Sequence, residues 1–421
     1  MTMRRIQSWL SCTLLFATVF ASACRGQERP ARAAGGEIDP ALLALVDSMV
    51  PRLEVLAGLV RLRPIAVAEQ DRADLRTYVE TRLNQELPPR ELEGLRQVYS
   101  ALGLIPDTLN IRALLLDLYQ EQVAGYYDPV SDKFYVIKGT PVGLLRPVLA
   151  HELVHALQDQ HANLDSLISR ARGNDRQSAA QAAIEGQATV VMFAFLSQEM
   201  SGRPVDPATL PDIGAQLRPA LEAQNSQFPV FKRAPRIIRE TMVFPYVGGA
   251  EFVQQLWRAR RADAFPAPFG PLLPQSTEQV LHAEDHFING RDAPVEVRFS
   301  AAANVQYENT LGELETGIFL STYLGSDARS AAAGWDGDRY QLLKADGGSV
   351  LLWQSVWDDA AAADRFAENC RHIAAQRTQR TMRVERNKVQ GREGVLVIDA
   401  QRNVDIAGIT TPSVRLLGTT P

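Results

Sequence analysis

The stretch RPVLAHELVHALQDQH, residues 146–161, holds three of the chain's six histidines. His151 and His155 lie four residues apart and enclose Glu152 in the pattern H-E-x-x-H. On an α-helix this spacing brings both imidazoles to one face, one turn apart, where they can bind one metal ion. Glu152 can then act as the general base for a water molecule that zinc activates. The pattern therefore predicts zinc chemistry; two ordinary hydrogen-bonded helix histidines are the alternative.

A catalytic zinc usually takes a third protein ligand, and the sequence offers two candidates. His161 follows His151 by ten residues, the spacing of the metzincin pattern H-E-x-x-H-x-x-G-x-x-H. That pattern needs a glycine where this chain has Gln158, so an unbroken helix would carry His161 about 9 Å beyond His155. Glu185 is the other candidate, because a lone carboxylate in the apolar stretch AAIEGQATVVM needs a partner. A salt-bridged or helix N-terminal glutamate is the alternative for Glu185.

At these residues the chain resembles the gluzincins, zinc metallopeptidases whose third ligand is a glutamate on a later helix. The resemblance rests on AHELVHALQDQH followed by AIEGQA and extends over about residues 126–286. It implies a zincin-like fold that holds Zn²⁺ on the two histidines and Glu185, with Glu152 as general base. It also implies cleavage of a peptide or protein substrate, whereas the residues alone support only metal-activated water chemistry.

The resemblance also implies a group that stabilises the oxyanion formed on the attacked carbonyl. Gluzincins commonly use a histidine or tyrosine that follows the third ligand. We expect His282, in PQSTEQVLHAEDHF, as the first candidate for this catalytic role, and Tyr246, in FPYVGG, as the second. His286 lies in the same stretch, part of which also matches a helix capping box at Ser276 or Thr277.

A predicted strand before the motif helix is the candidate substrate-binding element. Zincins place an edge strand there that pairs with an extended peptide, and SDKFYVI, residues 131–137, stands in that place. We expect Phe134 and Tyr135 in this strand to contact substrate. A plain core strand is the alternative.

The N-terminal residues are expected to lie outside the fold. Residues 1–23 combine the basic start MTMRR with a short apolar run and the small residues ASA, which predicts an export signal. Cys24 follows as in a bacterial lipobox, so we predict its lipidation, a membrane anchor and a location in the cell envelope. Residues 24–38 then form a polar tether. Cleavage after ASA to give a soluble secreted protein is the alternative.

Composition and apolar periodicity predict an α+β fold in two domains. The 421 residues are 46% hydrophobic with a formal net charge of −5, which allows a sizeable core and gives no basic footprint for nucleic acid. Residues 39–298 are expected to form a mainly helical catalytic domain with a small edge β-sheet, and residues 300–421 a small α+β domain. Helices are expected throughout residues 41–122 and at 144–167, 178–200, 236–246, 249–262 and 358–376. A strand pair is expected over residues 125–139, and a hairpin is expected around the Gly347–Gly348 turn in YQLLKADGGSVLLWQSVW.

The sequence as a whole predicts an exported, lipid-anchored zinc metallopeptidase. The rival from another class is a substrate- or partner-binding lipoprotein on the same scaffold, without turnover. The intact Glu152 argues against that rival, because a pure binding protein has no use for a general base. A third interpretation is a structural zinc that joins two helices, which four protein ligands would normally enclose.

Overall fold

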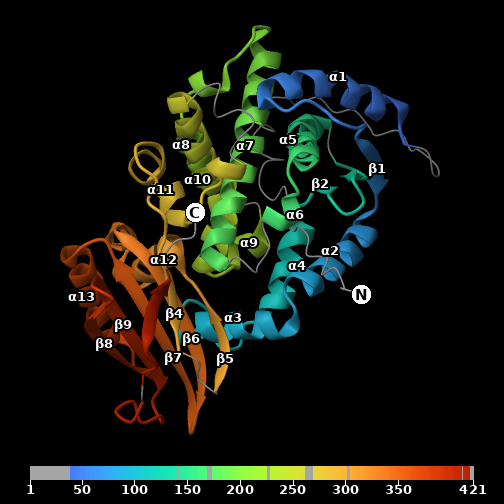
Figure 1. Ribbon diagram of the computed structural model, residues 1–421. Helices are drawn as coiled ribbons and strands as arrows, with labels where there is room; N and C mark the ends of the chain where they lie inside the picture. The colour runs from blue at the N-terminus through green and yellow to red at the C-terminus, as the bar shows by residue number, and fades with distance from the viewer. Residues whose placement is uncertain are drawn as a thin grey trace, which may run out of the picture.

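A computed structural model of the chain describes residues 38–417, except residues 141, 168–172, 225–227, 261–268, 301–303 and 410. The predicted export signal, Cys24 and the tether up to residue 37 lie outside the described residues. The described chain has the expected α+β class. Figure 1 shows a helical part built around α7 and, below it, a sheet-based part formed by the C-terminal residues.

Two long helices, α7 (Asn174–Ser201) and α10 (Arg236–Arg260), form the centre of the helical part. Their backbones touch, because a Cβ at Gly186 would lie 2.2 Å from the carbonyl of Gly249, and a Cβ at Gly249 would lie 2.1 Å from the oxygen of Ala182. The prediction of two helices over residues 236–262 is therefore wrong, since the glycines serve helix packing and do not end a helix. α7 is apolar enough to cross a membrane, yet 83% of its apolar window is buried inside the fold.

The motif helix α5 (Val142–His161) packs against α7 and against a small sheet. The sheet contains β1 (Ala66–Gln70), β2 (Gly125–Asp128) and β3 (Lys133–Ile137) in the order β1-β3-β2. β2 and β3 form the predicted strand pair. β1 interrupts the stretch that was expected to be wholly helical, and it pairs parallel with β3. The predicted edge strand, β3, is therefore the central strand.

Shorter helices complete the helical part. Several begin at side chains that accept a hydrogen bond from the first turn, such as Asp39 before the first helix and Asn110 before the fourth. Their bounds are α1 (Pro40–Ala57), α2 (Arg72–Glu86), α3 (Pro89–Ala101), α4 (Ile111–Gln122), α6 (Leu164–Leu167), η2 (Pro207–Thr209), α8 (Ile213–Gln224), α9 (Pro229–Arg233), η4 (Gly270–Leu272), α11 (Thr277–Leu281) and the π-helical turn η5 (Glu284–Ile288).

The sheet-based part is an antiparallel sheet with two helices on one face. Trp353 at its centre packs its ring 5.7 Å from that of Phe319 and 5.1 Å from that of Phe366, one from each helix. The expected hairpin at Gly347 is confirmed, whereas the first of the two helices was not predicted. The elements are β5 (Val305–Asn309), β6 (Trp335–Ala345), β7 (Gly348–Trp357), β9 (Arg392–Gln401) and β8 (Arg380–Val389) in sheet order, α12 (Gly312–Leu324), η6 (Ser326–Ala332) and α13 (Ala360–Gln376).

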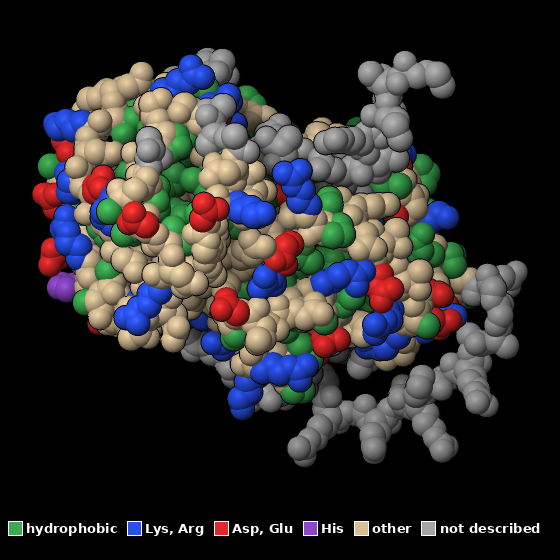
Figure 2. All heavy atoms as spheres, turned by 90° about the horizontal axis from the view of Figure 1, so that it is seen from below, with side chains coloured by type: hydrophobic (Ala, Val, Ile, Leu, Met, Phe, Trp, Pro, Cys, Tyr) green, Lys and Arg blue, Asp and Glu red, His purple; other side chains and the backbone are tan. Residues whose placement is uncertain are grey.

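The two parts share one continuous apolar core. The Tyr99 hydroxyl in α3 donates to Glu315 in α12 at 2.8 Å, so α3 is fastened to the sheet-based part. The predicted domain boundary near residues 298–300 falls at the end of a strand that pairs with a strand from the other side of it. β4 (Glu296–Phe299) pairs with the C-terminal strand β10 (Val414–Leu417) and so belongs with the residues that follow it. On the face drawn in Figure 2, positive and negative side chains alternate over the surface.

Candidate metal centre

Three side chains from two helices converge on one point in the helical part. Nε2 of His151 lies 3.0 Å from Nε2 of His155 and 3.0 Å from Oε2 of Glu185. The distance from Nε2 of His155 to the same Glu185 oxygen is 3.2 Å. The relative exposure of each of the three residues is 3% or less. The structure thus brings the H-E-x-x-H histidines and the later glutamate together, as the resemblance implied.

The spacing of these atoms fits a tetrahedral zinc ion. Ligand atoms about 2.0–2.1 Å from such an ion stand about 3.4 Å from one another, close to the triangle formed here. Two imidazoles and one carboxylate also form a donor set that catalytic zinc sites use. Within the described residues this set contains three protein groups, whereas a closed structural zinc site normally has four protein ligands.

The tautomer of His155 is set by a chain of buried amides. The amide nitrogen of Gln158 donates to the backbone oxygen of Ile184 at 3.0 Å and to Oε1 of Gln187 at 2.9 Å. A backbone oxygen can only accept, so Oε1 of Gln158 must face His155, where it lies 2.7 Å from Nδ1. His155 therefore keeps its hydrogen on Nδ1 and directs the Nε2 lone pair to the centre, the tautomer that a metal ligand requires.

The electrostatics of the three groups favour an ionised carboxylate. Burial alone would raise the pKa of Glu185, but the two histidines outweigh it and lower that pKa to about 2. Burial would also lower the pKa of His155, yet Glu185 raises it to about 9. Burial lowers the pKa of His151. Between the protein groups alone, His155 holds a proton beside the ionised Glu185, and a metal ion would compete with that proton.

Glu152 is aligned by the neighbouring sheet. Its Oε2 accepts a hydrogen bond of 2.7 Å from the backbone N–H of Tyr127, which lies in β2. The carboxylate is 1% exposed and follows His151 directly in α5. A buried carboxylate beside the two imidazoles, with one oxygen held by a backbone donor, is suited to take a proton from a water molecule at the centre.

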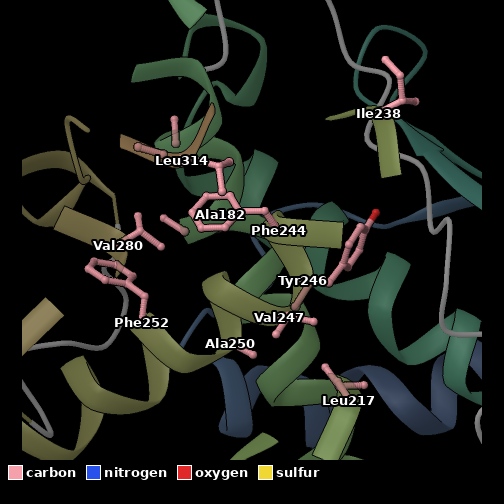
Figure 3. Packing of buried hydrophobic residues seen from close by; sticks show 14 of the residues in the cluster. Ala182, Leu217, Ile238, Phe244, Tyr246, Val247, Ala250, Phe252, Val280 and Leu314 are labelled. Atoms are coloured by element: carbon pink, nitrogen blue, oxygen red, sulfur yellow. The ribbon is translucent and has the colours of Figure 1, made fainter. Parts of the chain in front are cut away.

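Of the two expected oxyanion donors, the structure brings only Tyr246 to the centre. The rings of Tyr246 and His151 are 6.0 Å apart, and Figure 3 shows Tyr246 directed away from Phe244. His282 instead lies 2.8 Å from Glu313 in α12. Its segment is attached through Thr277 to the start of α7, about 15 Å along the helix from Glu185. The expectation for His282 is therefore corrected.

The expected substrate-binding residues are also corrected. Phe134 is 0% exposed in the core, and Tyr135 stacks on Tyr126 with ring centres 5.1 Å apart. Because β1 and β2 occupy both edges of β3, no edge of this strand is open to a peptide. His161 lies at the exposed end of the unbroken helix α5, and its Nε2 is 2.7 Å from the backbone oxygen of Val60. It is therefore not one of the three converging groups.

Two features of the centre escaped the sequence interpretation. Gln158 was considered only as the residue that replaces the metzincin glycine, although a buried amide three residues after His155 could have suggested a partner for that histidine. Gly186 follows Glu185 and allows α10 to approach, which places Tyr246 near the centre. The pair of small residues in IEGQA and YVGGA was the available signal for this contact.

Comparison with known families adds one finding. Residues 300–415 match a model described as a domain of unknown function, DUF8575. The match covers most of the sheet-based part and contains none of the three converging residues. No curated protein and no solved structure matches the chain.

Proposed function

We propose that the protein is an exported zinc-dependent metallopeptidase that cleaves peptide bonds, with Glu152 as general base. One observation carries the proposal: the donor atoms of His151, His155 and Glu185 lie within 3.0–3.2 Å of one another. Zinc, when bound by these three groups, supplies a Lewis acid and lowers the pKa of water. The lipid anchor at Cys24 remains part of the proposal and rests on the sequence alone.

The roles of the protein groups follow from their positions. Glu152 accepts the proton of the attacking water on the oxygen that Tyr127 does not hold, and then passes it to the leaving amine. Gln158 keeps His155 in the ligand tautomer throughout. Tyr246 is the candidate that stabilises the oxyanion, because its ring lies beside His151.

Zinc content tests the ligand set. We would measure zinc per chain by elemental analysis on the full-length protein purified in detergent, for the wild type, Glu185→Ala and His161→Ala. We expect Glu185→Ala to hold one zinc fewer than the wild type and His161→Ala to hold as many. If His161→Ala alone lost that zinc, the assignment of Glu185 as the third ligand would be contradicted.

Turnover separates the peptidase from the rival binding protein. Because the relevant side chains are buried, a library of short fluorogenic peptides is the first substrate to try. We expect Glu152→Gln to lose at least about 100-fold in kcat/KM while it retains zinc. Equal cleavage by wild type and Glu152→Gln would contradict the role of Glu152 as general base. Absence of cleavage of every peptide by the zinc-loaded wild type would favour the binding lipoprotein.

A further inference from the structure

A second group of potential metal ligands lies far from the first, where α11 is followed by the π-helical turn η5. π-helical turns are rare and are frequent at functional sites. The backbone N–H of Asp292 donates to the oxygen of His286 at 2.9 Å, so the chain after the turn folds back onto it. This fold places Asp292, His286 and the buried Glu278 side by side.

The donor atoms of these three residues all lie within 4.8 Å of one another. Nδ1 of His286 is 3.2 Å from Oδ2 of Asp292 and 4.0 Å from Oε1 of Glu278. The group is wider than the triangle around Glu185. The Asp292 side chain is 46% exposed, however, so it can move by the small amount that a shared ion requires.

Glu278 supplies an independent indication of a ligand. Its relative exposure is 1%, and its Oε1, which lies 4.0 Å from Nδ1 of His286, has no hydrogen-bond partner among the described residues. Burial and the nearby carboxylates, Glu313 first among them, disfavour an uncompensated negative charge at Glu278. An unpartnered buried carboxyl among other acids is costly unless a cation or a proton compensates it.

We propose that Glu278, His286 and Asp292 form a second metal site that binds a divalent first-row cation, with Zn²⁺ as the first choice. One imidazole and two carboxylates suit zinc or manganese, whereas the imidazole is a poor ligand for calcium or magnesium. A bound ion would fasten the turn η5 and the residues before β4 to α11. The site would thus stabilise the junction between the helical part and the sheet-based part.

Metal stoichiometry tests this site separately from the first. The full-length protein in detergent would be loaded with Zn²⁺, dialysed and analysed for zinc as wild type, His155→Ala, His286→Ala and the double variant, with His372→Ala as a surface control. We expect two, one, one and no zinc ions in that order, and two in the control. If His155→Ala held no zinc and His286→Ala held as much zinc as the wild type, the second site would be overturned. Retention in His155→Ala with loss in His286→Ala would uphold it even if the peptidase proposal failed.

Thermal unfolding gives a second readout that does not depend on activity. In the His155→Ala background, Zn²⁺ should raise the Tm, and Ca²⁺ at the same concentration should not. Adding Glu278→Gln should weaken the zinc response by about tenfold or more in apparent Kd while the metal-free protein still folds, because glutamine relieves the buried charge. The variant Glu284→Gln, at an exposed position in η5, is the control. An equal zinc response with and without Glu278→Gln would overturn the proposal.

Discussion

Glu185 in the candidate metal centre and Glu315 in α12 are both buried, with relative exposures of 3% and 4%. Their pKa values are nevertheless shifted in opposite directions. Two histidines lower the pKa of Glu185 to about 2. Burial, aided by Asp175 and Asp338, raises the pKa of Glu315 to about 8. The charges of the neighbouring groups, and not burial alone, therefore determine whether a buried carboxylate is ionised. Glu185 is anionic between the two histidines, whereas Glu315 is a neutral hydrogen-bonding group between α3 and α12.

The surroundings of Glu185 and of Glu315 also differ in the contacts that stabilise them. Glu185 lies on α7, whose backbone touches that of α10 at Gly186 and Gly249, and the two histidines lie on α5. The surroundings of Glu315 depend on side-chain hydrogen bonds, from Tyr99 at 2.8 Å and from Asn174 at 2.7 Å. We therefore expect the metal centre to be the more sensitive of the two to a change in helix spacing.

The substitution Gly186→Ala should have the largest effect. The added Cβ would stand 2.2 Å from the backbone of Gly249, which cannot move aside as a flexible side chain could. We expect a loss of about 3 kcal/mol or more in the free energy of unfolding, together with loss of zinc at the first site. Thermal unfolding and zinc analysis would measure both effects.

The matched control for this prediction is Gly290→Ala. A Cβ at Gly290 has no atom within 4 Å, so that variant should keep the stability of the wild type. If Gly186→Ala unfolded at the wild-type temperature, the close contact of α7 and α10 would not be what sets the metal centre.

Gln158→Met should have the next largest effect. Methionine fills a similar volume but cannot accept the hydrogen bond from Nδ1 of His155. We expect zinc affinity at the first site to fall about 10–100-fold, as when other partners of metal-binding histidines are removed. Competition with a fluorescent chelator would measure it. Gln216→Met, at an exposed position, is the control, and an unchanged Kd in Gln158→Met would show that the amide chain does not orient His155.

The sequence predicted which three side chains converge in the helical part, because helical spacing and the cost of a lone buried carboxylate are local properties. His151, His155 and Glu185 each follow from a few neighbouring residues, as does the hairpin around Gly347. The α+β class followed in the same way from apolar periodicity and from alternation on either side of that turn.

Properties that depend on distant pairing could not be predicted in this way. Nothing near Phe134 reveals that β1, more than sixty residues earlier, would cover the second edge of its strand. His282 was ranked by its position after Glu185, but only the tertiary structure shows that Glu313 is its partner. The glycines of α10 likewise indicated a break until the facing surface of α7 was known.

The smallest predicted effect is the contribution of Glu315 to the pH dependence of stability. Glu315 has an ordinary pKa of 4.5 when unfolded and a pKa of about 8 when folded, so between these values the native chain binds more protons than the unfolded chain. Its contribution to stability is therefore complete below about pH 4.5 and is lost as the pH rises toward 8. Glu315→Gln should remove this contribution, because Oε1 can still accept from Tyr99 and Asn174, and Oε2 has no hydrogen-bond partner in the described part of the chain. The Tm of the variant should fall by a few degrees less than that of the wild type between pH 5 and pH 8, whereas Glu368→Gln, at an exposed position, should follow the wild type. Identical pH profiles for Glu315→Gln and the wild type would mean that Glu315 is ionised in the folded chain, and the contrast with Glu185 would no longer hold.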